Sequence, residues 1–263
     1  MLGGWGLPNS YVVLHDRGRG YRDIHGTRHG KQKKQVRLSL TWALLAQGRQ
    51  IVLSMEGGGY VMWLGLAVSY FLLYRASELW AYANGQVHPG ICLTRNCLNF
   101  FHGGAQAAFE NRSTATAVQV KFLVSKSDQG REGCTITRTR LEKKTEKAVA
   151  SIGAFEALLE LLNTCPQLPR GGPLTVRNTS LGWNVTRSNV VMALRLMVAS
   201  SVRDPTQFAL HSGRIGGATQ LASLGISELQ IRRAGRWKSR AFTAYVREAG
   251  EGANLVSAAL AKT

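Results

Sequence analysis

The stretch that most limits how this chain can fold runs from residue 60 to residue 74, where almost every side chain is apolar. A helix needs about 20 such residues to span a bilayer, and here Arg75 and Glu78 follow at once. The stretch is therefore too short for a membrane span and must be buried in a protein core. We expect a long, mostly apolar helix over residues 60–82 that ends at the turn pair Asn84-Gly85.

Helical patterns also dominate much of the remaining chain. Ser39 or Thr41 can cap a helix that continues to about Ser54, and the glycines at 57–59 end it. Further helices are expected over residues 149–163, 186–201, 212–224, 227–234, 239–248 and 255–261. The chain is therefore predicted to be mainly α-helical.

Two segments do not follow this helical pattern. Residues 117–125 and 133–139 are rich in Val and Thr and alternate between apolar and polar side chains, and turn residues such as Asp128 and Gly130 lie between them. This pattern predicts a β-hairpin with Lys126 at its turn. The fold class that follows is α+β, mainly α-helical, with a small antiparallel sheet or hairpin.

The charge of the chain indicates a polyanionic partner. Lys and Arg number 33 against 15 Asp and Glu, a formal charge of +18, and the 44% of hydrophobic residues is enough to build a core. These values exclude a disordered basic tail and favour DNA or RNA over an anionic membrane surface. Residues 1–38 show no amphipathic pattern, so we expect a flexible basic arm or linker that binds DNA through Lys31, Lys33 and Lys34.

The sequence predicts no cofactor and no metal site. Its four cysteines are too few for a disulfide scaffold, and Cys92 and Cys97 lack a second Cys or His pair at zinc spacing. The first ten residues lack the basic start and apolar run of a signal peptide. We expect an intracellular protein that is located with DNA, in the nucleus of a eukaryote or in the cytoplasm or nucleoid of a prokaryote.

Polar residues of chemically useful types occur in a fixed order along the chain. The segment His211-Ser212-Gly213-Arg214 is followed by Trp237 in a Gly-Arg-Trp sequence and by Tyr245 eight residues later. Far upstream, Arg75 and Glu78 form an Arg-x-x-Glu box at the end of the apolar stretch. With the hairpin lysine between them, this ordered set resembles the tyrosine recombinases of the phage-integrase type, including those of transposable elements.

The resemblance covers about residues 39–248 and implies a tyrosine recombinase catalytic-domain fold. It assigns residues 39–263 to a domain that breaks and rejoins DNA. Full recombinases place a helical core-binding domain before this catalytic domain, and we expect that domain to be absent from the chain. The family assembles on its sites, so the partners expected are double-stranded DNA and further copies of the chain in a tetramer.

The chemistry of the family explains the cationic and hydrogen-bonding residues. Attack by a hydroxyl on a phosphodiester creates a pentacoordinate phosphorus with extra negative charge on its non-bridging oxygens. Arg75 and Arg214 supply fork-shaped guanidinium groups that can clamp those oxygens. His211 and the indole N–H of Trp237 can donate further hydrogen bonds, and His211 can also accept the proton of the nucleophile. Glu78, one helical turn from Arg75, is expected to orient it.

The remaining roles also follow from the resemblance. Tyr245 is the nucleophile and forms a 3′-phosphotyrosine, while Lys126 protonates the departing 5′ oxygen. This chemistry needs neither a metal ion nor ATP. Around Trp237, further basic residues are expected to bind DNA phosphates: Arg232, Arg233, Arg236, Lys238 and Arg240.

Other interpretations of the same residues stay open. Each of them taken alone is more often structural or merely exposed than catalytic, and the chain could be a catalytically weak or inactive DNA-binding relic. A type IB topoisomerase shares the chemistry. An RNA-binding basic protein fits the charge but does not account for the ordered set.

Overall fold

The computed structural model describes residues 37–55, 58–88, 90–123, 133–141, 152–178, 183–199, 201, 203–239, 243 and 246. All of them belong to one compact unit that starts at Arg37. Several predictions lie outside the described residues: Lys126, Tyr245, Arg240, the arm lysines Lys31, Lys33 and Lys34, and the helices over 239–248 and 255–261.

The first helix, α1, spans Trp42–Leu53, as its capping pattern predicted. The Thr41 hydroxyl accepts a hydrogen bond of 3.2 Å from the backbone amide of Leu44, which satisfies one of the free donors at the helix start. The apolar stretch follows as α2, Gly59–Phe71, in which 11 of 13 residues are buried. The predicted buried central helix is therefore confirmed.

The predicted length of that helix is wrong. It ends at Phe71 instead of continuing to residue 82, and a separate short helix, α3, covers Ala76–Leu79. Leu73, between the two helices, has a φ of 51° in the left-handed region. The backbone carbonyl of Leu73 accepts a hydrogen bond from the Arg214 side chain, so tertiary contacts override the apolar helical pattern at this turn.

The predicted hairpin is confirmed as part of a larger sheet. Strands β3 (Ala117–Phe122) and β4 (Cys134–Thr139) pair antiparallel, from Ala117 opposite Thr139 to Phe122 opposite Cys134. Two strands that the sequence did not reveal, β1 (Leu98–His102) and β2 (Ala105–Ala107), complete a sheet of order β2-β1-β3-β4. A second pair joins β5 (Val176–Asn178) to β6 (Trp183–Asn184).

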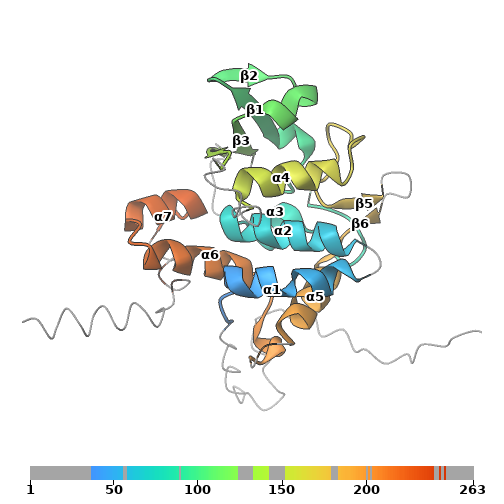
Figure 1. Cartoon of the computed structure of the whole chain (residues 1–263), viewed down its shortest axis with the longest axis vertical. Coiled ribbons are helices and arrows are strands. Elements are labelled where there is room, and N and C mark those ends of the chain that lie inside the picture. The colour runs from blue at the N-terminus through green and yellow to red at the C-terminus, as the bar shows by residue number, and fades with distance from the viewer. Residues whose placement is uncertain are drawn as a thin grey trace, which may run out of the picture. The chain divides into compact units, whose positions relative to one another are not determined.

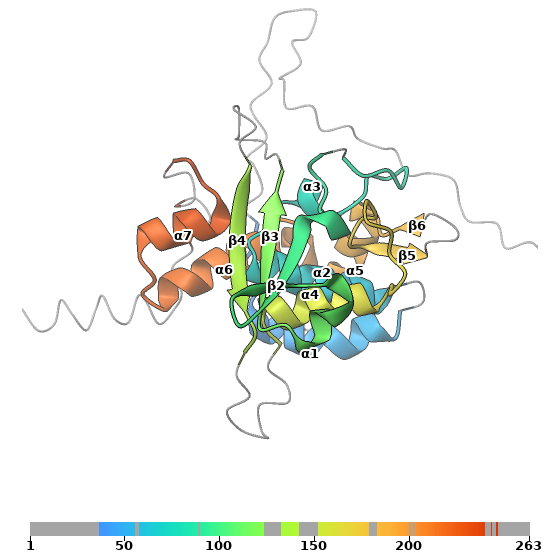
Figure 2. The ribbon, with the colours of Figure 1, turned by 90° about the horizontal axis from the view of Figure 1, so that it is seen from above.

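Four later helices correspond to predicted ones: α4 (Ala154–Asn163), α5 (Arg187–Ala199), α6 (Ser212–Ser223) and α7 (Glu228–Gly235). Short 3-10 turns connect the elements at η1 (Arg95–Cys97), η2 (Phe109–Thr114) and η4 (Pro205–Gln207). Helix α2 lies at the centre and contacts α1, α4 and α6, while α4 also contacts β4 (Figures 1 and 2). The observed α+β, mainly helical architecture agrees with the predicted fold class.

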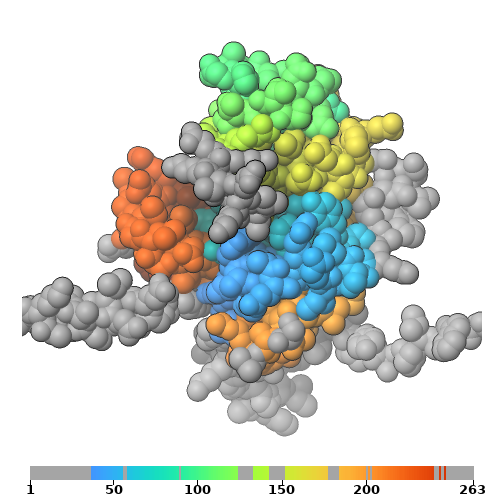
Figure 3. All heavy atoms as spheres, in the orientation of Figure 1, coloured from blue at the N-terminus to red at the C-terminus, as the bar shows by residue number. Residues whose placement is uncertain are grey.

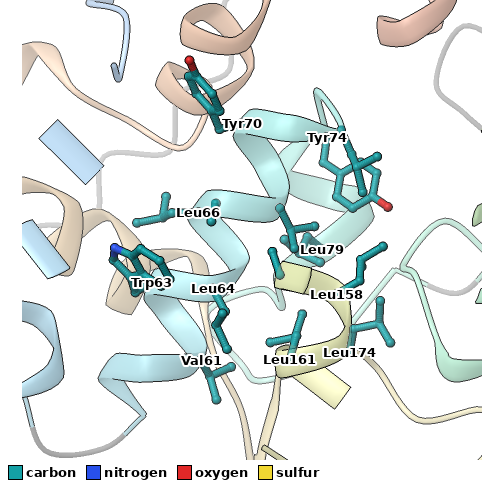
Figure 4. Close-up of a cluster of buried hydrophobic side chains, with 14 of the residues drawn as sticks. Val61, Trp63, Leu64, Leu66, Tyr70, Tyr74, Leu79, Leu158, Leu161 and Leu174 are labelled. Atoms are coloured by element: carbon teal, nitrogen blue, oxygen red, sulfur yellow. The ribbon is translucent and has the colours of Figure 1, made fainter. Parts of the chain in front are cut away.

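The core gathers on both sides of α2. Leu64 of α2, Leu158 and Leu161 of α4 and Leu174 lie together on one side, whereas Trp63 lies on the other (Figure 4). Burial of such side chains is the main driving force of folding. Over the described parts of the chain, no helix is both long and apolar enough to cross a membrane.

Close packing of α6 depends on a glycine, which gives a first testable prediction. A Cβ at Gly216 would overlap the backbone carbonyl of Leu40, and the amide of Leu40 donates to the carbonyl of Ser212 at 3.0 Å. Gly216→Ala is therefore expected to destabilise the chain by about 1–3 kcal/mol through overpacking, measured by denaturant unfolding.

The matched control is Gly171→Ala. A Cβ at exposed Gly171 would meet nothing within 4 Å, so this change should stay within about 0.5 kcal/mol of the parent chain. Equal unfolding midpoints for the two variants would contradict the proposed packing of α6 against residue 40.

Candidate functional site

The candidate site forms where three segments far apart in the sequence meet. They are residues 72–78, which cover the turn after α2 and most of α3, then the start of α6, and the end of α7. Arg214 of α6 donates to the carbonyl of Leu73, a residue 141 positions earlier. Helices α6 and α7 contact each other and form one side of the molecule next to α1 and α2 (Figure 3). The first Arg box and the His-x-x-Arg box are therefore brought together.

Glu78 is the shared acceptor of the site. Its side chain is fully buried, and its Oε1 accepts from Nη1 of Arg75 at 3.0 Å. Its Oε2 accepts from the backbone amide of Arg75 at 2.8 Å and from Nη2 of Arg236 at 2.5 Å. One carboxylate thus holds two guanidinium groups in fixed positions, which is the orienting contact with Arg75 that the sequence suggested.

Arg214 is held from several directions. It is 1% exposed, and its guanidinium donates to the carbonyls of Leu73 and, at 2.5 Å, Gly235. The ring of Trp237 lies against it, with 4.2 Å between the guanidinium carbon and the ring centroid. By contrast, the side chain of Arg75 is 18% exposed. Of the two predicted phosphate clamps, Arg75 reaches solvent and Arg214 is covered by Trp237.

Arg236 lies differently from what the sequence predicted. We expected a solvent-facing phosphate contact, but its side chain is only 5% exposed and forms an ion pair with Glu78. Its Nη1 donates to the carbonyl of Leu72 at 3.2 Å, and its guanidinium carbon lies 3.7 Å from the ring centroid of Phe122. The structure therefore places the Arg236 side chain inside the protein and not at the surface, where the sequence placed it.

Backbone strain is concentrated in the same place. Among the described residues, the non-glycine residues with positive φ are Leu73 at 51° and Arg236 at 57°. A left-handed conformation is costly for a residue with a Cβ and persists only where surrounding contacts hold it. Leu73 accepts hydrogen bonds from Arg214 and Arg236 through its carbonyl, so both strained residues belong to one network.

Burial shifts the pKa of two side chains next to this network, Tyr74 and Arg138. Burial raises the pKa of the Tyr74 hydroxyl, an effect that the nearby charge of Arg236 opposes, and no described residue forms a hydrogen bond with this hydroxyl. Burial also lowers the pKa of Arg138 on β4, with Tyr74 and Arg236 as its further electrostatic neighbours. The described part of the site thus gathers several guanidinium groups, two of which pair with the carboxylate of Glu78.

The other predicted residues lie around this network. His211 immediately precedes α6 and is half-buried, as is Trp237. Arg233 and Lys238 are exposed, and Arg232 donates to the carbonyl of Lys238 at 3.1 Å. Sequence reasoning missed four members of the network, since nothing in their local pattern marks them: Leu73, Tyr74, Phe122 and Arg138.

The structure offers no obvious metal centre in the part of the chain that it describes. No group of three or more His, Cys, Asp or Glu side chains there is arranged to hold a metal ion. The cationic charge of the site comes from its own arginines.

Comparisons with known proteins identify the fold. No protein-family model matches the chain, and no curated protein matches it either. Among solved structures, the XerH site-specific recombinase in its post-cleavage complex with a palindromic difH substrate matches 88% of this chain and 55% of its own, with 11% identity and a TM-score of 0.51. This match shows a shared fold, in agreement with the predicted catalytic-domain fold.

Two further matches have lower scores. XerH in its pre-cleavage complex matches 90% of this chain and 59% of its own, with 12% identity and a TM-score of 0.47. The Tn1549 transposon integrase in complex with transposon right end DNA matches 88% of this chain and 68% of its own, with 14% identity and a TM-score of 0.47. The chain therefore spans less than two thirds of the length of XerH.

Proposed function

We propose that the chain breaks and rejoins double-stranded DNA as a tyrosine recombinase, through a 3′-phosphotyrosine intermediate. The observation that carries the proposal is the meeting of the two arginine boxes. The Arg214 side chain donates a hydrogen bond to the turn that leads into Arg75, and the Glu78 carboxylate accepts one from the Arg75 side chain. In an unrelated helical protein, we would not expect two boxes so far apart in the sequence to lie next to each other. The fold that the chain shares with XerH supports the same conclusion.

In the proposed reaction, a phosphodiester bond of the DNA is exchanged for a bond between phosphorus and Tyr245. The Tyr245 oxygen attacks the scissile phosphorus, its proton passes to His211, and a P–O bond to Tyr245 replaces the P–O5′ bond. Lys126 protonates the departing 5′ oxygen. A 5′ hydroxyl from a second DNA end then attacks the phosphotyrosine and gives its proton to Lys126. The released Tyr245 oxygen takes its proton back from His211, so that no external energy source is needed.

The arginines stabilise the transition state in this proposal. Arg75, which is partly exposed, is the guanidinium that meets the non-bridging oxygens first. Arg214 completes the clamp once the Trp237 ring moves from its face, and Trp237 then donates its indole N–H to the phosphate. Exposed Arg233 and Lys238 bind flanking phosphates, as do Arg232, Arg240 and the arm lysines. We further propose that copies of the chain assemble on the DNA.

A second candidate function rests on the burial of Arg214. Its guanidinium is 1% exposed and is occupied by two backbone carbonyls and by Trp237. A site that stays closed in this way would bind DNA through the +18 charge without cutting it. This alternative is a non-catalytic DNA-binding protein.

Covalent trapping tests the proposal. The chain is incubated with a library of nicked duplexes of random sequence, in which cleavage next to the nick releases a short fragment and prevents religation. The proposal expects a DNA–protein adduct that survives detergent and maps by mass spectrometry to the peptide containing Tyr245. Salt-dependent binding without any adduct would support the non-catalytic candidate. Relaxation of supercoiled plasmids that lack the selected site would indicate a type IB topoisomerase.

A further inference from the structure

We infer that Arg236 is a positioning residue for the cleavage step, acting through Glu78 and Phe122, and is not a DNA ligand. The inference rests on the proposed function, because it concerns the reaction proposed above. It assigns a function to a residue that stands next to Trp237 in the sequence and whose side chain is buried against Glu78.

The contacts of Arg236 reach three separate segments. Its Nη2 forms the 2.5 Å ion pair with the buried carboxylate of Glu78, and Glu78 in turn holds Arg75 at 3.0 Å. Its Nη1 donates to the carbonyl of Leu72 at 3.2 Å, in the turn that precedes Arg75. Arg236 therefore fixes both the backbone and the side-chain partner of the proposed phosphate ligand Arg75.

The third segment is the β3–β4 pair. The guanidinium carbon of Arg236 stacks 3.7 Å from the centroid of Phe122, which is the last residue of β3. Lys126 follows Phe122 by four positions in the sequence. Helix α7 lies beside the β3–β4 pair (Figure 2), so Arg236 links the turn before Arg75 to the base of the hairpin that carries the proposed general acid.

The backbone of Arg236 supplies an independent argument. The residue caps the end of α7 with a φ of 57°, a position that glycine occupies most easily. An arginine here adopts a strained conformation that glycine would relieve. Strain of this kind persists where surrounding contacts over-determine it. Backbone hydrogen bonds to the end of α7 would remain with a glycine here, whereas the contacts with Glu78, Leu72 and Phe122 need the arginine side chain. The side chain is therefore the reason for an arginine at this position.

A residue that binds DNA phosphates directly is expected to have an exposed side chain. Arg233, one turn earlier on α7, is exposed, whereas the Arg236 side chain is 5% exposed and faces Glu78. A phosphate contact contributes about −0.9 to the slope of log affinity against log salt concentration. A positioning residue contributes nothing to that slope, so the two roles are separable by measurement.

The test compares Arg236→Gly with the parent chain on the duplex selected by covalent trapping. Glycine removes the side chain and relieves the backbone, so the variant is expected to stay folded. We expect the single-turnover rate of adduct formation at saturating DNA to fall about 10- to 100-fold, as displaced catalytic groups cause, with DNA affinity and its salt slope unchanged. Arg236→Lys, which can keep the ion pair with Glu78, should recover part of the rate.

Two controls make the result specific. Arg170→Gln removes one exposed positive charge far from the network in sequence and should leave the rate of adduct formation unchanged. In the double variant Arg236→Gly with Glu78→Gln, the rate should fall by clearly less than the product of the two single effects, because the two changes share the contact between Arg236 and Glu78. Multiplying effects would mean that Arg236 acts independently of Glu78 and would overturn the inference.

The remaining outcomes are also decisive. A normal rate in Arg236→Gly with a salt slope reduced by about 0.9 would make Arg236 a phosphate ligand and overturn the inference, while leaving the proposed function intact. A normal rate with a normal slope would overturn it as well. Failure of the parent chain itself to form an adduct would instead remove the proposed function, and the inference with it.

Discussion

A Tyr245→Phe chain is expected to form no covalent adduct with DNA while it binds the same duplex as tightly as the parent chain. Phenylalanine keeps the ring but lacks the hydroxyl oxygen that must become bonded to phosphorus. The remaining groups still present positive charge to the DNA, so affinity and its salt dependence should not change. The expected loss is therefore complete for the adduct and absent for binding, a contrast that a folding defect cannot produce.

The measurement is denaturing gel analysis of the trapped adduct, paired with a binding titration at several salt concentrations. Tyr82→Phe is the matched control, because Tyr82 is 37% exposed and lies beside Arg187, outside the candidate site. This control should yield as much adduct as the parent chain. Adduct formation by Tyr245→Phe at the parent level would assign the nucleophile to another residue and would remove Tyr245 from the mechanism.

Local sequence patterns were sufficient for most helices and for one hairpin. Thr41 caps α1 as its residue type suggests, and the Val-rich alternation over 117–122 became β3. Local patterns failed where a long-range contact determines the backbone conformation. No local pattern distinguishes residues 72–75 from a continuing apolar helix, because the turn is held by Arg214, 141 residues away from Leu73. Strand β2, with three residues and no apolar alternation, gave no signal either.

The same distinction applies to the candidate site. The order of these residue types along the chain, which resembles that of a known family, pointed to Arg75, Glu78 and Arg214, and the fold does bring them together. What the sequence could not give is the direction in which a side chain faces. Arg233 and Arg236 belong to the same basic run, yet one is exposed and the other forms an internal ion pair. The backbone of Arg236, at the end of α7, is left-handed with a φ of 57°, which the residue type did not predict.

The carboxylate of Glu78 is expected to matter for both stability and cleavage. It is fully buried and accepts hydrogen bonds from Arg75 and Arg236. Glu78→Gln preserves the shape of the side chain but removes the negative charge between two guanidinium groups. Removing one partner of a buried ion pair leaves the other charge uncompensated, which typically costs about 3–5 kcal/mol.

Denaturant unfolding of Glu78→Gln should therefore show a large loss of stability, and its melting temperature should fall by about 2–4 °C for each kcal/mol lost. The control is Glu110, which is 76% exposed and lies 3.8 Å from the partly buried Arg95. Glu110→Gln is expected to cost less than about 1 kcal/mol, because water screens such a pair. Equal stabilities of the two variants would show that the buried carboxylate does not hold the arginines together.

The effect of Glu78→Gln on cleavage should exceed what the unfolded fraction explains. Below the unfolding midpoint, where the chain remains folded, we expect the rate of adduct formation at saturating DNA to fall about 10²- to 10³-fold, the size typical of a lost charge-stabilising contact. Glu78→Asp keeps the charge on a shorter side chain and should retain more activity than Glu78→Gln. If both variants cleaved at the parent rate, Arg75 would not depend on Glu78 for its position, and the network would serve folding alone.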